Sequence, residues 1–237
     1  MKTLPIISIL IIVSFFSCSF NKNQDKKAII EPTNTIYGKW VRIGQTGPIS
    51  FNFKENGLIE ADFGNDQTID VVSKFEISGD TINFIDEEGK TCQGIGKYKI
   101  YLTKYYVAFD LIDDDCGGRI KTTMGFWTKP NFKDLITTLN TEIDKSSNPE
   151  LYLNRGRIFM ATGMVANAKK DFDSYLLKDT LNARVYINRA GTRFPNDLSG
   201  VVSDCNKAIA IDSNNKNAFF LRGLARYELG EKEQGCE

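Results

Sequence analysis

The sequence predicts two domains behind an export signal: an all-β antiparallel meander, followed by all-α helical hairpins. Three observations predict this order. The chain begins with a short basic start and an apolar run, its apolar residues then alternate with period two, and after Lys129 the period changes to about 3.6. We therefore divide the chain into a signal peptide (1–17), a polar tether (18–35), a β-domain (36–129), a connecting helix (130–147) and helical repeats (148–237).

The first residues predict export and attachment to a membrane. Lys2 precedes the mostly apolar run Leu4–Phe16, which is too short for a transmembrane helix of about 20 residues. The order Phe-Phe-Ser-Cys at 15–18 resembles the lipobox of bacterial lipoproteins, although Phe16 stands where a small residue is usual. The resemblance implies that Cys18 becomes the lipidated first residue of the mature chain, on the periplasmic side or at the cell surface. The alternative is ordinary secretory cleavage, with Cys18 left as a thiol or removed.

Composition limits the chemistry and the partners. Residues 18–237 carry 29 bases and 30 acids, a net charge of −1, which provides no basic field for a nucleic acid. The chain has no histidine, the commonest general base and transition-metal ligand. Acids are plentiful, but their spacing selects no catalytic pair. We expect no enzyme activity, no cofactor and no metal site.

The β-domain reads as roughly eight short strands. In "ISFNFK", Ile49, Phe51 and Phe53 fall on one face, and signals such as Asn56-Gly57 mark the turns between such runs. A meander of this size closes most easily into a barrel, because closure removes exposed edges. The opening Gly38-Lys39-Trp40 resembles the G-x-W start of lipocalin-like domains, in which the tryptophan plugs one end of a small barrel.

Such barrels enclose a ligand in some cases, but an eight-stranded barrel is just wide enough to be filled by side chains. We expect the second arrangement, with an interior of phenylalanines: Phe51, Phe53, Phe63, Phe75, Phe84 and Phe109. Cys92 and Cys116 flank one strand pair at the same end of the sheet, and in an exported chain this predicts a disulfide. The acids Asp113–Asp115 predict a solvated turn rather than a calcium site.

The helical part repeats. Three segments, "LYLNRGRIF", "VYINRAGTRF" and "AFFLRGLARY", align on Arg155, Arg189 and Arg222, which are 34 and 33 residues apart. This period, with an aromatic residue three positions before the arginine and a small residue after it, resembles tetratricopeptide repeats (TPRs). The resemblance covers residues 149–237 and implies paired helices, with the third repeat incomplete at its second helix.

In that family the first helices line a concave groove that takes a partner's peptide or helix. Seven positions are expected to be exposed on this groove: Leu153, Arg157, Met160, Arg184, Ile187, Phe220 and Tyr227. Their apolar and cationic groups suit an extended, somewhat acidic segment of a protein, so the sequence predicts a membrane-anchored interaction module. Two alternatives stay open. Some of these residues pack against the β-domain, or the barrel acts as a small-ligand carrier or inhibitor with the repeats as a spacer.

Overall fold

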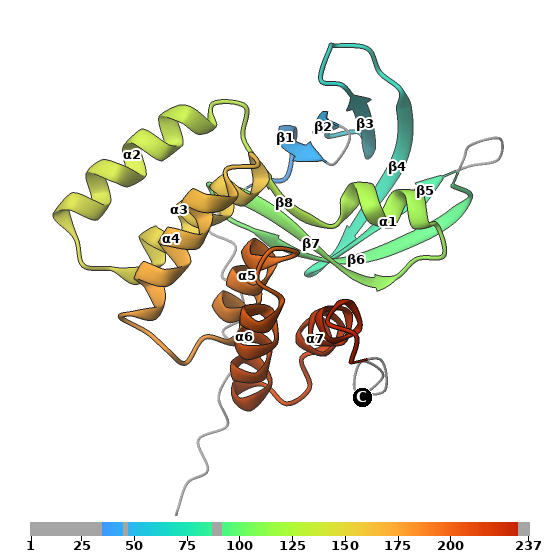
Figure 1. The fold of residues 1–237 in the computed structure, drawn as a ribbon. Coiled ribbons are helices and arrows are strands. Elements are labelled where there is room, and N and C mark those ends of the chain that lie inside the picture. The colour runs from blue at the N-terminus through green and yellow to red at the C-terminus, as the bar shows by residue number, and fades with distance from the viewer. Residues whose placement is uncertain (1–34, 45–46, 87–91, 232–237) are drawn as a thin grey trace, which may run out of the picture.

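The computed structural model describes residues 35–44, 47–86 and 92–231. Within these ranges an antiparallel β-barrel is followed by an arc of helices that runs along the outside of its last strands (Figure 1). In the chain, the short helix α1 (Gly117–Thr123) comes after the seventh strand of the barrel and before the eighth. No helix in the described part of the chain is long and apolar enough to cross a membrane.

The barrel is a closed meander of eight strands, each antiparallel to the next, as the alternating pattern predicts. Closure depends on the pairing of the first and last strands, in which Val41 lies opposite Thr128. The strands are β1 (Gly38–Gly44), β2 (Gly47–Phe53), β3 (Leu58–Phe63), β4 (Val71–Ser78), β5 (Thr81–Asp86), β6 (Gly94–Leu102), β7 (Tyr106–Asp113) and β8 (Gly125–Thr128).

Aromatic rings fill most of the barrel interior. Trp40 is fully buried, and its indole N–H donates to the carbonyl of Ile36 at 2.7 Å, so it plugs the end at which β1 begins. Phe51 stacks on Trp127 with 4.0 Å between ring centroids. Five of the six predicted interior phenylalanines are buried, but the prediction for Phe63 is wrong, because this ring is 47% exposed. It keeps the inward register of β3 but lies beyond Ala61, where pairing with β4 stops.

The helices after the barrel form antiparallel pairs. Their bounds are α2 (Phe132–Lys145), α3 (Pro149–Ala161), α4 (Val165–Leu176), α5 (Ala183–Arg193), α6 (Leu198–Ile211) and α7 (Lys216–Glu228). Gly156 in α3 lies against Phe172 of α4, and Ala190 and Ala168 are fully buried at equivalent crossings. Small residues at these positions let the paired helices approach closely.

The arginines that define the repeat period join each helix pair. Arg155 donates from Nε and Nη2 to the carboxylate of Asp171 at 2.8 and 2.6 Å, and Arg189 makes the same two-pronged contact with Asp204 at 3.0 and 2.5 Å. A two-pronged contact fixes orientation as well as position. Each repeat arginine also donates a hydrogen bond to a side chain of the preceding helix: Arg155 to Asn140, Arg189 to Asp173 and Arg222 to Asn206.

The barrel and the helices share a core. Tyr105, Tyr106 and Ala108 at the start of β7 pack in one buried cluster with Leu139 of α2 and Ile158 of α3. The predicted connecting helix is therefore also part of the junction between the two parts. This junction holds α3 against the barrel, which determines what remains open on the concave side of the repeats.

Candidate binding site: a cleft between the barrel and the repeats

Three of the seven predicted groove residues line a common cleft. Arg157, Arg184 and Ile187 face a cavity of about 420 Å³ between the outside of the barrel and the concave side of the repeats. Phe220 and Tyr227 are exposed, as predicted, at 71% and 57%, but they do not line this cleft.

Two predicted exposures are wrong. Leu153 and Arg157 are only 3% and 6% exposed. For Arg157 the cause is the barrel, because α3 packs against β8, β7 and β1 and this guanidinium lies against Tyr106 and Phe126. Leu153 is instead buried in the helical core, in one cluster with Phe172 of α4 and Val185 of α5. Met160 is half-buried against the helical core. The alternative that some groove residues pack against the β-domain is therefore confirmed for Arg157.

The cleft has one wall from each part of the chain. Strands β6 and β7 supply Lys99, Tyr101, Tyr106 and the segment 108–112, and α5 supplies Arg184, Ile187 and Asn188. The start of α7 and the loop before it add polar groups, namely Asp212, Asn214, Asn215, Lys216 and Asn217. The cleft is thus lined by aromatic rings on the barrel side, by arginine and lysine side chains, and by several amides at the start of α7.

Aromatic rings of the barrel position both arginines. The guanidinium carbon of Arg184 lies 3.7 Å from the centroid of the Tyr101 ring. That of Arg157 lies 4.9 Å from Tyr106 and 5.5 Å from Phe126, and Arg157 also donates to the Tyr106 hydroxyl. Sequence reasoning missed all three rings, because the outward face of a strand contacts whichever helix later packs on it, and the strand pattern does not indicate which helix that is.

A second cavity of about 400 Å³ opens at the mouth of the barrel, under α1. Its apolar lining includes Phe51, Ile59, Ala61, Phe63 and Phe84, and its polar lining includes Asp70, Ser73, Asp86, Arg119 and Thr122. The interior therefore combines the two predicted arrangements, because it is packed at the Trp40 end and hollow at the opposite end.

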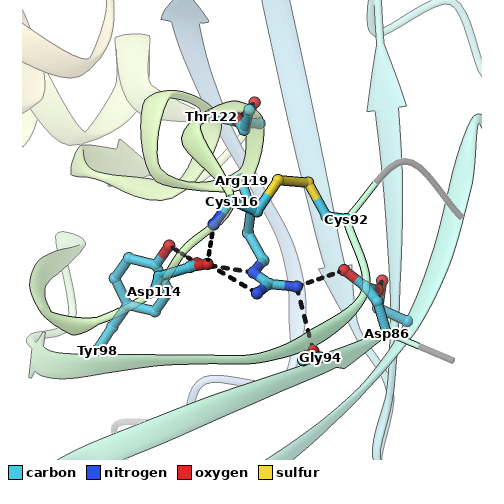
Figure 2. Close-up of a disulfide and its surroundings, with 10 residues drawn as sticks. Asp86, Cys92, Gly94, Tyr98, Asp114, Cys116, Arg119 and Thr122 are labelled. Carbon is cyan, nitrogen blue, oxygen red and sulfur yellow. Dashed lines mark hydrogen bonds and ion pairs between the residues drawn. A yellow bond between two sulfur atoms is a disulfide. The ribbon is translucent and has the colours of Figure 1, made fainter.

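The predicted disulfide is present at this mouth. Cys92 and Cys116 are joined, with 5.6 Å between their α-carbons, and the bond ties the start of α1 to the β5–β6 side (Figure 2). Beside it, Arg119 donates to Asp114 at 2.7 Å and to Asp86 at 2.8 Å (Figure 2). α1 is thus held over the mouth by one covalent bond and two ion pairs.

The prediction of a solvated turn is wrong for Asp114, whose side chain is fully buried. Burial alone would raise the pKa of this carboxyl, but hydrogen bonds from Arg119, Tyr98 and the backbone N–H of Cys116 outweigh burial and leave the pKa below its ordinary value. The two hydrogen-bonded carboxylates raise the pKa of Arg119. The sequence did not indicate which of the three adjacent acids, Asp113–Asp115, would be buried.

The remaining candidate groups are the other cysteines and the side chains that could ligate a metal. Cys205 is a buried free thiol, and burial raises its pKa to about 11, so it is a poor nucleophile. Cys18 and Cys236 lie outside the described residues. Within residues 35–44, 47–86 and 92–231, no three histidine, cysteine or acidic side chains gather as a metal site would require.

Comparison with known proteins yields likenesses to solved structures only. No family model matches the sequence, and no curated protein matches it. The chain is similar to the crystal structure of MamA, with 21% identity, 52% of this chain and 70% of the other covered, and a TM-score of 0.44. It is also similar to the first TPR of Spaghetti (RPAP3) bound to an HSP90 peptide, with 25% identity, 38% and 72% covered, and a TM-score of 0.36. Because both scores are below 0.5, the TPR-like assignment rests on the helix pairs and the arginine spacing.

Proposed function

We propose that this chain is an exported lipoprotein, anchored through Cys18, that binds a segment of a partner protein in the cleft between its barrel and its second and third repeats. The 420 Å³ cleft carries the proposal. It is large enough for a specific site, and it combines aromatic rings with a few converging polar groups. The proposal assigns no chemical reaction to the chain.

The location of the cleft changes how the repeats work. In this chain the barrel covers most of the concave side of α3 and leaves Arg157 at the edge of the cleft, so among the described helices the open faces belong to α5 and α7. The barrel then acts as one wall of the site, with Tyr101 and Lys99 facing the helices. A partner segment is expected to lie across β6 and β7 and to end against the start of α7.

The test is affinity capture with a variant that fills the cleft without disturbing the fold. Asn217 is exposed and lines the cleft, so Asn217→Trp adds bulk at the rim and removes no buried contact. Ser203→Trp on α6 is the matched control, since Ser203 is also exposed but does not line the cleft. We expect a partner captured by the wild type and by the control to be lost with Asn217→Trp. Equal capture by all three proteins would reject the cleft as the binding site.

The cavity at the barrel mouth supports a second candidate function, the carriage of a small apolar molecule. Its walls are largely apolar, and its main cation, Arg119, is already paired with Asp114 and Asp86, so a neutral ligand suits it better than an anion. Ala61 lines the cavity and is buried. Ala61→Phe should fill the space and reduce binding of the neutral dye Nile red, whereas unchanged dye binding would reject this site.

A further inference from the structure

Arg157 and Arg184 differ from most arginines of the fold in what they pair with. Arg119, Arg155 and Arg189 each make an ion pair with a carboxylate at 2.8 Å or less. Among the described residues, neither Arg157 nor Arg184 has a carboxylate within 4 Å. Both arginines line the same cleft.

Arg157 is the more unusual of the two, because it is buried and makes no ion pair with a described residue. Its described partners are neutral: the Tyr106 hydroxyl and, in the amide orientation that satisfies both neighbours, the Asn188 oxygen at 3.3 Å. Burial lowers the pKa of its guanidinium and outweighs Tyr106 and the carboxylate of Glu150, which act in the opposite direction, while the charge of Arg184 adds to the lowering. An unpaired buried charge is costly, so such a group indicates a site for an external anion.

Arg42 provides a useful contrast. It is half-buried and likewise makes no ion pair with a described residue, but it donates to two backbone carbonyls, those of Thr122 and Met124 at the end of α1. The C-terminal end of a helix carries partial negative charge, which favours a cation. Arg42 therefore has an internal counterpart in the fold, and no such carbonyls are found among the described partners of Arg157.

The two guanidinium groups differ in how many N–H groups remain free to bind a ligand. Arg184 makes no side-chain hydrogen bond to a described residue, whereas Arg157 already donates to Tyr106 and, in the satisfied amide orientation, to Asn188. A guanidinium that lies on an aromatic face uses its plane for that contact, while its N–H groups point outward within the plane. Arg184 lies over Tyr101, whereas Arg157, beside Tyr106, offers only the N–H groups that its two hydrogen bonds leave unused. A carboxylate matches such an edge with two parallel hydrogen bonds.

The charges around the cleft favour an anion. Four cationic side chains line it, against two carboxylates, Asp110 and Asp212. Asp212 accepts from the backbone N–H of Asn214 and from the amide of Asn215 at 3.2 and 2.9 Å, so it is engaged in its own loop. Lys99 is itself paired with Asp80 at 3.3 Å, so the excess of positive charge at the cleft is carried chiefly by the two arginines.

We infer that Arg157, Arg184 and Asn188 form a receptor for a carboxylate and that its occupant is an acidic segment of a partner protein. The inference rests on the proposed function, and it specifies the chemistry of the partner. The amide side chains at the rim, Asn214 and Asn217 among them, suit a peptide backbone. The alternatives, a small polycarboxylate or a phosphate, are outcomes of the test.

The test is calorimetric titration of the full mature chain with two acetylated, amidated octapeptides, one alternating Glu with Leu and the other alternating Gln with Leu. We expect the acidic peptide to bind about tenfold or more tightly than its amide counterpart, and more weakly at high salt. Arg184→Gln should weaken the binding of the acidic peptide about tenfold. Arg222→Gln is the matched control, because Arg222 stacks on Phe219 and donates to Asn206 outside the cleft, and it should change nothing.

Arg157→Met supplies a readout that does not depend on affinity. If the buried charge is uncompensated, replacing it with an apolar chain should leave the melting temperature equal or raised, and the acidic peptide should no longer raise it further. A large drop in melting temperature would contradict the inference. So would equal binding of the two octapeptides, or citrate or inorganic phosphate that binds more tightly than the acidic peptide.

The outcomes also separate this inference from the proposed function. If Arg184→Gln captures the partner as well as the wild type does, while Asn217→Trp does not, the cleft binds a protein but the carboxylate receptor is rejected. If no partner is captured but the acidic peptide binds with the expected dependence on Arg184, the receptor stands and the proposed partner-binding function is rejected.

Discussion

Gly156 is the position at which close helix packing can be tested with a single methyl group. A β-carbon added there would lie 2.6 Å from Cε1 of Phe172 and 3.1 Å from two further ring atoms, and Phe172 is fully buried. Overpacking of this kind costs about 1–3 kcal/mol. The gain in helix propensity from Gly to Ala returns about 0.5–1 kcal/mol. We therefore expect Gly156→Ala to lower the free energy of unfolding by about 0.5–2 kcal/mol.

Gly191 provides the matched control, because it lies in the first helix of the next repeat. A β-carbon there would meet only Cε of Met160, at an ordinary 3.9 Å, so Gly191→Ala should keep the propensity gain and stabilise the fold by about 0.5–1 kcal/mol. Urea unfolding followed by circular dichroism measures both variants. If Gly156→Ala is as stable as Gly191→Ala, the close crossing of α3 and α4 is not what requires a glycine there.

Three further predictions concern the anchor, the disulfide and the buried carboxylate. Fatty-acid labelling should mark the wild type but not Cys18→Ala, which should become soluble in the exported fraction. A Cys18→Ala variant that is still labelled would contradict anchoring through Cys18. Replacing Cys92 and Cys116 with Ser opens a cross-link between residues 24 apart and should cost about 3 kcal/mol in unfolding free energy, whereas a Cys205→Ala control should leave the cross-link intact in a non-reducing peptide map. Asp114→Asn should destabilise the fold at pH 7, and the difference should shrink as the pH falls below 3.8, because a depressed folded-state pKa stabilises only the ionised form. A difference that does not change with pH would reject the role of that ion pair.

Local patterns predicted most of the fold. Period-two alternation and the turn signals indicated the barrel, Trp40 indicated its plugged end, and the spacing of Arg155 and Arg189 indicated the helix pairs. Each of these signals is carried by residues close together in sequence. The Cys92–Cys116 disulfide was also predictable, because both cysteines flank one pair of consecutive strands.

The site was less predictable, because it depends on how two parts of the chain pack on each other. A helical period shows that Leu153 and Arg157 share a face of α3, but it does not show that Arg157 meets the barrel and Leu153 the neighbouring helices rather than solvent. The same limit applies to Tyr101 and Tyr106, whose outward positions on the strands become part of a cleft only when α3 and α5 lie beside them. Phe63 had the correct inward register, but the sequence did not show that the barrel opens at that level.

The central claim, that partners bind between the barrel and the repeats, is tested most directly by site-specific photo-crosslinking in the living cell. A photoreactive amino acid placed at Asn217 lies at the rim of the cleft, and one placed at Lys207 lies on the exposed side of α6, outside the cleft. We predict a defined crosslinked protein from position 217 and none from position 207. Crosslinks that arise equally from both positions, or only from position 207, would contradict the account.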